Sequence, residues 1–113
     1  MKIASLKKRK DFLDIAQNGK KASSKGLLLQ VRKRSTSDDY INVGYTATKR
    51  LGNAVIRNRI KRRLRALSSE VLTAFANTEY DYVIIGKKAS LERDFKDLRK
   101  DLKYTLHSTN THK

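Results

Sequence analysis

Residues 49–65 read KRLGNAVIRNRIKRRLR, and this segment decides how the rest of the chain is interpreted. Asn53 is suited to cap a helix, because its side-chain oxygen can accept a hydrogen bond from a free backbone amide of the first turn. After it, apolar residues recur at steps of three and four: Ile56, Ile60, Leu64, Leu67, Val71 and Phe75. This spacing predicts a helix over residues 54–76 with one continuous buried stripe.

The opposite face of the predicted helix is cationic. Residues 40–69 contain no Asp or Glu, so no acidic neighbour along the helix neutralises the basic side chains. With a rotation of about 100° per residue, one arc opposite the stripe holds Asn58, Lys61, Arg62 and Arg65. Arg57, Arg59 and Arg63 flank the stripe, where they either widen the basic face or lie along the edge of the core.

Arginine suits this face to RNA, because guanidinium groups bind phosphates in a bidentate manner and stack on bases. RNA with splayed loops is favoured, and duplex DNA is the alternative that charge alone leaves open. The formal net charge of the 113-residue chain, +16, also points to a polyanion. An anionic membrane surface is less favoured, since no basic stretch combines its lysines with strong apolar anchors.

Length favours one domain over residues 1–113, with a polar C-terminal tail from about residue 107. The chain has no Cys, which excludes disulfides, zinc–thiolate sites and thiol catalysis. The first residues show no apolar stretch of signal-peptide length, so a cytoplasmic location is expected.

The flanking segments predict an α+β two-layer sandwich. Residues 6–17 have helical spacing, and Asn18-Gly19 ends that helix. LLLQVR after Gly26 and YINVGYT from residue 40 alternate as two antiparallel strands, joined by a hairpin through a polar turn at residues 35–39. YDYVIIG, residues 80–86, has no polar face and reads as a central strand, and residues 90–106 predict a final amphipathic helix.

Residues 49–65 also resemble the signature of the bacterial ribonuclease P protein family. The RNR core of that signature stands at residues 57–59, after GNAV at residues 52–55. Weaker similarity covers LKK at residues 6–8, Phe12, VG at residues 43–44 and DYVII at residues 81–85. The resemblance implies a two-layer α/β sandwich similar to domain 2 of ribosomal protein S5. Such a fold has a small, mostly antiparallel sheet of about four strands, three helices and a left-handed crossover through the basic helix, against the usual right-handed rule.

The function implied by the resemblance is that of an accessory subunit of a tRNA 5′-processing endoribonuclease. The subunit binds the catalytic RNA and the 5′ leader of precursor tRNA, as a monomer in a 1:1 protein–RNA complex without a membrane partner. Mg²⁺ held mainly by the RNA activates water for phosphodiester cleavage, so no catalytic residue or metal ligand is expected in this chain. A small ribosomal or nucleoid protein is the alternative that composition permits.

Two sets of site residues follow from the resemblance. The first, the RNA-binding set, contacts the catalytic RNA: Lys49, Arg50, Asn53, Arg57, Asn58, Arg59, Lys61, Arg62 and Arg65. The second, the leader set, lines a cleft between the first helix and the sheet: Lys8, Phe12, Lys20, Lys21, Gln30, Thr46 and Thr48. Phe12 matches an aromatic wall on which a base stacks, or it belongs to the core. Ala16 and Gln30 replace aromatic residues usual in the family, so lysines and threonines are expected to contribute more to leader binding.

Independent catalysis by the protein finds little support in the sequence. His107 and His112 lie in the polar tail, where solvated histidines are expected. Asp94, Asp97 and Asp101 recur among lysines on the last predicted helix, a pattern typical of a solvated helix face. A hydrolytic metal site would need convergent ligands in a water-poor cavity.

Overall fold

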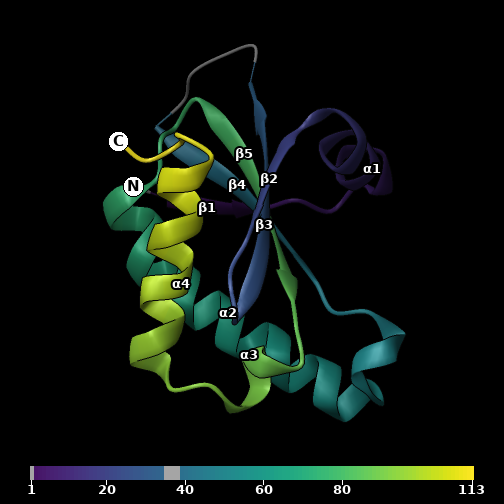
Figure 1. Cartoon of the computed structure of the whole chain (residues 1–113). Coiled ribbons are helices and arrows are strands. Elements are labelled where there is room, and N and C mark those ends of the chain that lie inside the picture. The colour runs from purple at the N-terminus through teal and green to yellow at the C-terminus, as the bar shows by residue number, and fades with distance from the viewer. Residues whose placement is uncertain (1, 35–38) are drawn as a thin grey trace.

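A computed structural model describes residues 2–34 and 39–113 (Figure 1). The predicted turn at residues 35–39 therefore lies almost wholly outside the described residues. The strands are β1 (Lys2–Ser5), β2 (Lys20–Ser23), β3 (Leu27–Lys33), β4 (Tyr40–Thr46) and β5 (Tyr80–Gly86). The helices are α1 (Arg9–Asn18), the short 3₁₀ helix η1 (Lys49–Leu51), α2 (Ala54–Phe75), α3 (Ala89–Glu92) and α4 (Phe95–Ser108).

The strands form one sheet in the order β1-β4-β5-β3-β2. β4 runs parallel to both β1 and β5, whereas β3 runs antiparallel to both β5 and β2. The predicted hairpin of β3 with β4 is therefore wrong, because β5 lies between them. The apolar run Val83-Ile84-Ile85 gives β5 no polar face, which suits it to the centre of a sheet covered on both sides.

Helices cover both faces of the sheet (Figure 1). On one face α2 and α4 enclose the main core, to which the sheet contributes residues such as Leu29, Val43 and Ile84. On the other face α1 lies against the sheet and buries Ile15. The predicted α+β class with one open sheet is confirmed, with five strands in place of about four and two of the four pairings antiparallel. The main core forms the predicted two layers, and α1 adds a cover on the other face of the sheet. The crossover from β4 to β5 passes through α2, and its left-handed sense stays a prediction.

The two outer strands escaped prediction because each has four residues and little apolar signal. α1 begins at Arg9 rather than at residue 6, since the Leu6 amide donates to the Val43 carbonyl and prolongs the pairing of β1 with β4. The helix predicted over residues 90–106 is divided into α3 and α4, which are separated at Arg93-Asp94. Phe75, placed by its spacing on the buried stripe, is 43% exposed at the last residue of α2.

The C-terminal residues, predicted as a polar tail from about residue 107, pack against the fold. α4 continues to Ser108, and the side chains of Thr109 and Thr111 beyond it are buried. The Tyr82 hydroxyl donates to the Thr111 carbonyl at 2.8 Å, and burial raises the pKa of Tyr82 to about 12. These contacts fasten the chain end to the centre of the sheet. No helix in the described parts of the chain has the length and apolarity needed to cross a membrane.

Candidate nucleic-acid interface

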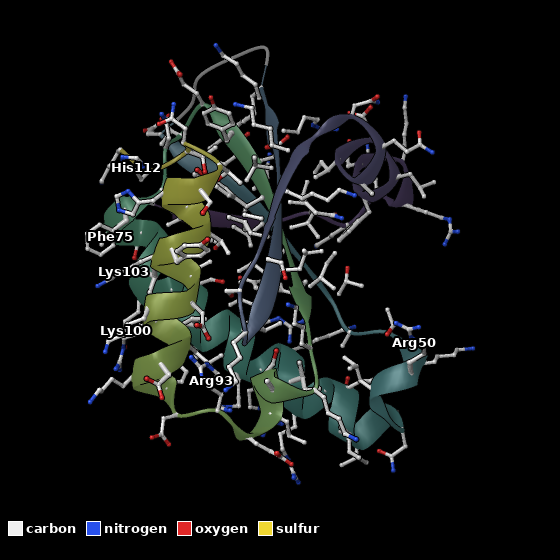
Figure 2. The ribbon with its side chains drawn as sticks, viewed as in Figure 1. Arg50, Phe75, Arg93, Lys100, Lys103 and His112 are labelled. Carbon is white, nitrogen blue, oxygen red and sulfur yellow. The ribbon has the colours of Figure 1, made fainter. Side chains whose placement is uncertain are left out.

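A tight turn presents the first residues of the RNA-binding set. Gly52 has a φ of 144°, a backbone conformation that residues with a Cβ rarely adopt. Asn53 then caps α2 as predicted, because its side-chain oxygen accepts a hydrogen bond from the Ile56 amide at 3.0 Å. Lys49 and Arg50 in η1 are exposed beside this turn, and Figure 2 shows Arg50 projecting away from the sheet.

Burial of the apolar stripe fixes which face of α2 meets solvent. Ile60, Leu64 and Leu67 have at most 1% of their surface exposed. The residues exposed on the helix surface include Asn58, Arg59, Arg62 and Arg65. Among residues 2–34 and 39–113, the ion pairs involve other basic residues: Arg32, Arg34, Arg93 and Arg99. The exposed charges of α2 are therefore available to an external anion.

The three arginines that flank the stripe differ from one another. Arg63 donates to the carbonyls of Ser90 at 2.6 Å, Leu91 at 2.8 Å and Arg93 at 2.6 Å. It therefore ties α2 to the end of α3 at the core edge. Arg57 is half-buried with its Nε enclosed, whereas Arg59 is exposed and widens the basic face.

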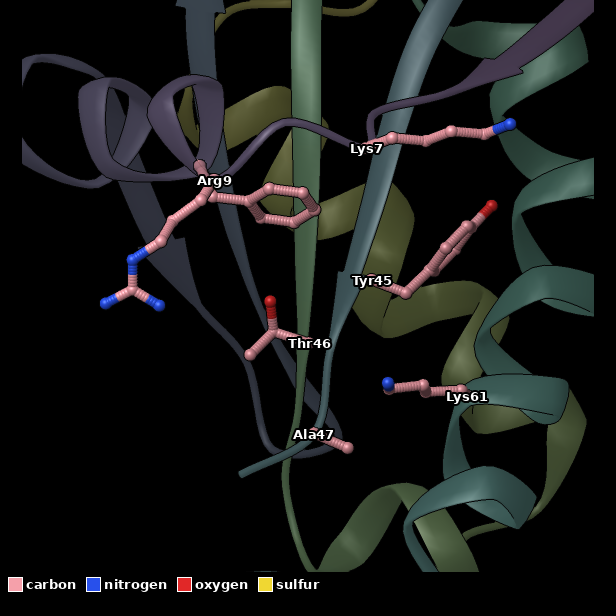
Figure 3. Close-up of a pocket in the computed structure, with 7 residues that line it drawn as sticks. Lys7, Arg9, Tyr45, Thr46, Ala47 and Lys61 are labelled. Carbon is pink, nitrogen blue, oxygen red and sulfur yellow. The ribbon is translucent and has the colours of Figure 1, made fainter. Parts of the chain in front are cut away.

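A pocket of about 410 Å³ lies between α1, β4 and α2 (Figure 3). Its lining residues are Lys7, Arg9, Phe12, Tyr45, Thr46, Ala47 and Lys61. Phe12 and Thr46 come from the leader set and Lys61 from the RNA-binding set, so the two sets meet here. Phe12 packs closely on the sheet, because a Cβ on Gly44 would lie 2.5 Å from two of its ring carbons. Phe12 is thus half-buried and lines the pocket as well.

The remaining leader residues fall into separate places. Lys21 pairs with Gln30 across β2 and β3, so both side chains lie on the α1 face, and Gln30 is only 8% exposed. Lys20 pairs with Val31, a residue of the main core, and therefore points to the opposite face from the cleft. Lys8 is exposed just before α1.

Thr48 lines a second pocket of about 360 Å³ at the end of the sheet. Its other lining residues are Leu28, Arg50, Leu51, Ile85, Gly86, Lys87 and Lys88. Leu28 and Ile85 are register partners on β3 and β5, and both point to the α1 face of the sheet. The pocket therefore lies at the end of that face. The cations at its rim include Arg50, which belongs to the RNA-binding set.

A network of acidic residues around Arg32 holds α1 on the sheet. Arg32 donates to Asp14 of α1 at 2.8 Å and to Asp81 of β5 at 2.6 Å. Asn42 of β4 also donates to Asp81, at 3.1 Å. The hydrogen bond from Arg32, then that from Asn18, lowers the pKa of Asp14 below its usual value. These carboxylates are thus paired within the fold.

The ribonuclease P family model matches residues 1–110. This chain belongs to the ribonuclease P protein family. The "Ribonuclease P protein component" of Paramagnetospirillum magneticum is 43% identical over 104 residues, which cover 89% of this chain and 78% of that protein. The relative of the same name from Gluconacetobacter diazotrophicus is 44% identical over 101 residues, 89% of this chain and 86% of that protein.

Solved ribonuclease P proteins have the same fold. The structure described as the RNase P protein from Thermotoga maritima superposes with a TM-score of 0.75 at 29% identity, and covers 88% of this chain and 92% of that chain. An RNase P protein from Staphylococcus aureus gives a TM-score of 0.77 at 21% identity over 96% of this chain and 97% of that chain, which supports the fold alone. The family match favours a ribonuclease P protein over the small ribosomal or nucleoid protein that composition permitted.

Several residues that line the two pockets were not predicted as site residues from the sequence. They are Lys7, Arg9, Tyr45 and Ala47 in the first pocket and Lys87 and Lys88 in the second. Lys7 and Arg9 were available as signals, since they stand next to Lys8 in the sequence. Tyr45 was predicted only as part of the strand that begins at residue 40, because the open edge of β4 depends on where β1 ends.

The charges of the interface suit an anion better than a protein-bound divalent cation. Nowhere in the described residues do three or more His, Asp or Glu side chains gather in a group able to hold a metal ion. The carboxylates closest to α1 are paired with Arg32. The side chains exposed on this surface offer cations and hydrogen-bond donors.

Proposed function

We propose that this chain is the protein subunit of ribonuclease P, and that it binds the catalytic RNA and the 5′ leader of precursor tRNA. The observation that carries the proposal is the pocket in which Lys61 of α2 meets Phe12 and Thr46 of the cleft. One protein molecule then holds the catalytic RNA on the α2 face while the leader runs under α1. The two RNAs are brought together at the border of these surfaces.

The basic face of α2 acts by neutralising phosphates of the catalytic RNA. Arg59, Arg62 and Arg65 are exposed and can bind phosphate oxygens in a bidentate manner. Asn58 adds a neutral donor and acceptor between them. Each phosphate contact releases a condensed counterion, so the affinity depends strongly on salt.

The leader cleft acts on a single strand. Phe12 offers an aromatic ring for stacking, and Thr46 and Lys21 offer polar groups along the sheet. Stacking and phosphate contacts tolerate any base, which suits a protein that meets many different leaders.

In this proposal the phosphodiester is cleaved by the RNA. Mg²⁺ held mainly by that RNA supplies the activated water, while the cationic surfaces of the protein reduce repulsion between the two RNA strands. The side chains of this chain bind, orient and screen charge. Since both surfaces belong to one chain, a monomer in a 1:1 complex suffices, and the cytoplasm, where precursor tRNA is processed, is the expected location.

Reconstitution tests the proposal. The purified chain is mixed with a bacterial ribonuclease P RNA and a precursor tRNA at low Mg²⁺, where the RNA alone is slow. We expect restored release of the 5′ leader and a mature tRNA 5′ end. Binding of that RNA without any stimulation of cleavage would contradict the proposal and point to a plain RNA-binding protein.

A further inference from the structure

The edge of β4 opens where β1 ends. β1 pairs with β4 from Tyr40 to Val43, and the Leu6 amide adds one more hydrogen bond to the Val43 carbonyl at 3.1 Å. The chain then leaves for α1. Along a strand, the backbone N–H and C=O groups of successive residues point to opposite neighbouring strands. The backbone groups of Tyr45 therefore face the same edge of β4 as those of Val43, at a point beyond the end of β1.

The open edge lies in the 410 Å³ pocket described above, which we call the β4-edge pocket. Figure 3 shows Tyr45, Thr46 and Lys61 around it, with Lys7 and Arg9 above. The volume lies within the range of about 300–1,000 Å³ that is usual for small-ligand pockets.

The aromatic ring of Tyr45 is held in place from the α2 side. The Arg65 guanidinium lies 5.4 Å from the ring centroid, which orients the ring by a cation–π contact. Tyr45 is half-buried against the main core, so its ring is supported rather than mobile. A supported aromatic ring is a good stacking surface, because little conformational freedom is lost on binding.

We infer that the β4-edge pocket binds one unstacked nucleotide of single-stranded RNA, with its base against Tyr45 and its phosphates near Lys7, Arg9 and Lys61. The inference rests on the proposed function and adds a subsite to it. An aromatic ring, a backbone donor and acceptor, and three cations within one pocket match the three parts of a nucleotide: base face, base edge and phosphate. A paired base in a duplex could not enter such a pocket.

The β4-edge pocket places an aromatic ring next to a cleft that lacks two aromatic residues usual in the family. Ala16 and Gln30 offer no aromatic surface, and Gln30 is almost fully buried. Tyr45 is the register partner of Ile84, so its side chain lies on the α2 face of the sheet, opposite Gln30. Its ring lines the β4-edge pocket at the border of the cleft and offers a separate stacking surface there. Every base carries neighbouring donors and acceptors on its edge, so a single backbone N–H and C=O give only a modest base preference.

Two RNAs could supply the nucleotide: the precursor leader, or an unpaired position of the catalytic RNA. The experiment therefore has two arms, each with single abasic sites that keep the backbone and remove one base. In the first arm the abasic site is moved along the leader. In the second it is moved through the unpaired nucleotides that the protein protects in the catalytic RNA.

The protein variant is Tyr45→Leu, which keeps an apolar side chain and removes the ring. Its control is Tyr104→Leu on α4, where Tyr104 is 60% exposed and outside the pocket. In the reconstituted complex, we expect Tyr45→Leu to weaken RNA binding by about 5- to 100-fold. At one abasic position, the wild type should lose as much affinity as Tyr45→Leu loses on intact RNA. The same abasic site should not weaken the binding of Tyr45→Leu any further. Tyr104→Leu should behave as the wild type does.

The RNA in which the abasic site and Tyr45→Leu together cost no more affinity than either change alone is the source of the nucleotide. Equal affinity of Tyr45→Leu and the wild type at every abasic position would overturn the inference. Unfolding by urea shows whether Tyr45→Leu is folded. If it is not, the wild type is photocrosslinked to RNA carrying 4-thiouridine, and the absence of crosslinks at residues 45–47 would be equally contrary.

The proposed function and the pocket can fail separately. If the wild type does not stimulate cleavage by the ribonuclease P RNA, the proposed function is contradicted, independently of the effect of Tyr45→Leu. The pocket is then tested with the free protein and a short single-stranded RNA, by the same comparison of Tyr45→Leu with Tyr104→Leu. If the wild type stimulates cleavage normally and Tyr45→Leu binds RNA as tightly as the wild type, only the nucleotide subsite is rejected.

Discussion

Two arginine-rich regions of the molecule differ in what faces their guanidinium groups. Beneath α1, Arg32 lies between the carboxylates of Asp14 and Asp81, at 2.8 and 2.6 Å. On α2, Arg59 and Arg62 are exposed, and residues 40–69 contain no Asp or Glu. The same residue type therefore joins two elements of the fold in the first region and is left for an external anion in the second.

The position of the carboxylates, rather than the number of arginines, decides which arginines form ion pairs within the fold. Asp11 and Asp14 are three residues apart on α1, so they lie on one helix face and meet Arg32. Arg63 is a third case, since its partners are backbone carbonyls of α3. No pattern of charges in the sequence reveals a partner of that kind.

The largest effect is expected from the buried side of α2. Leu64→Ala removes a fully buried side chain from the core and should lower the free energy of unfolding by about 2–5 kcal/mol. Urea unfolding followed by circular dichroism measures this. Arg62→Ala, two residues earlier on the exposed face, should change stability by no more than about 0.5 kcal/mol. Similar losses for both variants would show that the two faces of α2 are not distinct.

The same substitution in each region tests the comparison directly. Arg32→Met leaves the buried carboxylate of Asp81, 6% exposed, with Arg34 at 3.4 Å and Asn42 as remaining partners. The expected loss of stability is about 1–3 kcal/mol. Arg59→Met should leave urea unfolding within about 0.5 kcal/mol of the wild type. A harmless Arg32→Met change would mean that the network does not stabilise the fold.

The cap of α2 gives a smaller effect. Asn53→Ala removes the acceptor for the Ile56 amide and should cost about 1 kcal/mol in thermal unfolding experiments. Asn53→Asp keeps an acceptor and should remain close to the wild type in stability. If Asn53 also contacts RNA, the added negative charge of Asn53→Asp weakens RNA binding, and unchanged affinity would assign Asn53 to the cap alone.

The smallest effect is a dependence of stability on pH. The hydrogen bond from Arg32 lowers the pKa of Asp14 in the folded state below its ordinary value of 3.8. The ionised carboxylate therefore stabilises the fold above about pH 4, and this contribution is lost as the pH falls through the lowered pKa. Urea unfolding at pH 5, 4 and 3 should show a weaker pH dependence for Asp14→Asn than for the wild type. An identical dependence would contradict the role of Asp14.

Long periodic elements were predictable from the sequence, and pairing was not. α2 ends within one residue of its predicted bounds, and β5 has its predicted bounds, because each carries a strong pattern of its own. β1 and β2 are short, basic edge strands with little local signal. The place of β5 between β3 and β4 depends on tertiary packing, which local sequence patterns do not reveal. For this reason the predicted hairpin of β3 with β4 was wrong.

The candidate site shows the same division. Helical phasing placed Asn58, Lys61, Arg62 and Arg65 on one face without any structure. Three of them are exposed, whereas Lys61 is half-buried and lines the pocket beside α1. The cleft was harder, because a shift of one residue in strand register moves a side chain to the other face. Lys20 was assigned to the cleft for its charge, but its pairing with Val31 turns it away.

The central claim is that the exposed arginines of α2 bind phosphates of the ribonuclease P RNA, and its most direct test is the salt dependence of that binding. The affinities of the wild type and of a variant with Arg59→Ala and Arg62→Ala are measured over a series of salt concentrations. Lys96→Ala with Lys100→Ala on α4 removes the same charge elsewhere and is the control. We expect the slope of log affinity against log salt to fall by about 1.5–2 for the α2 variant and much less for the control. An unchanged slope for the α2 variant would contradict the claim.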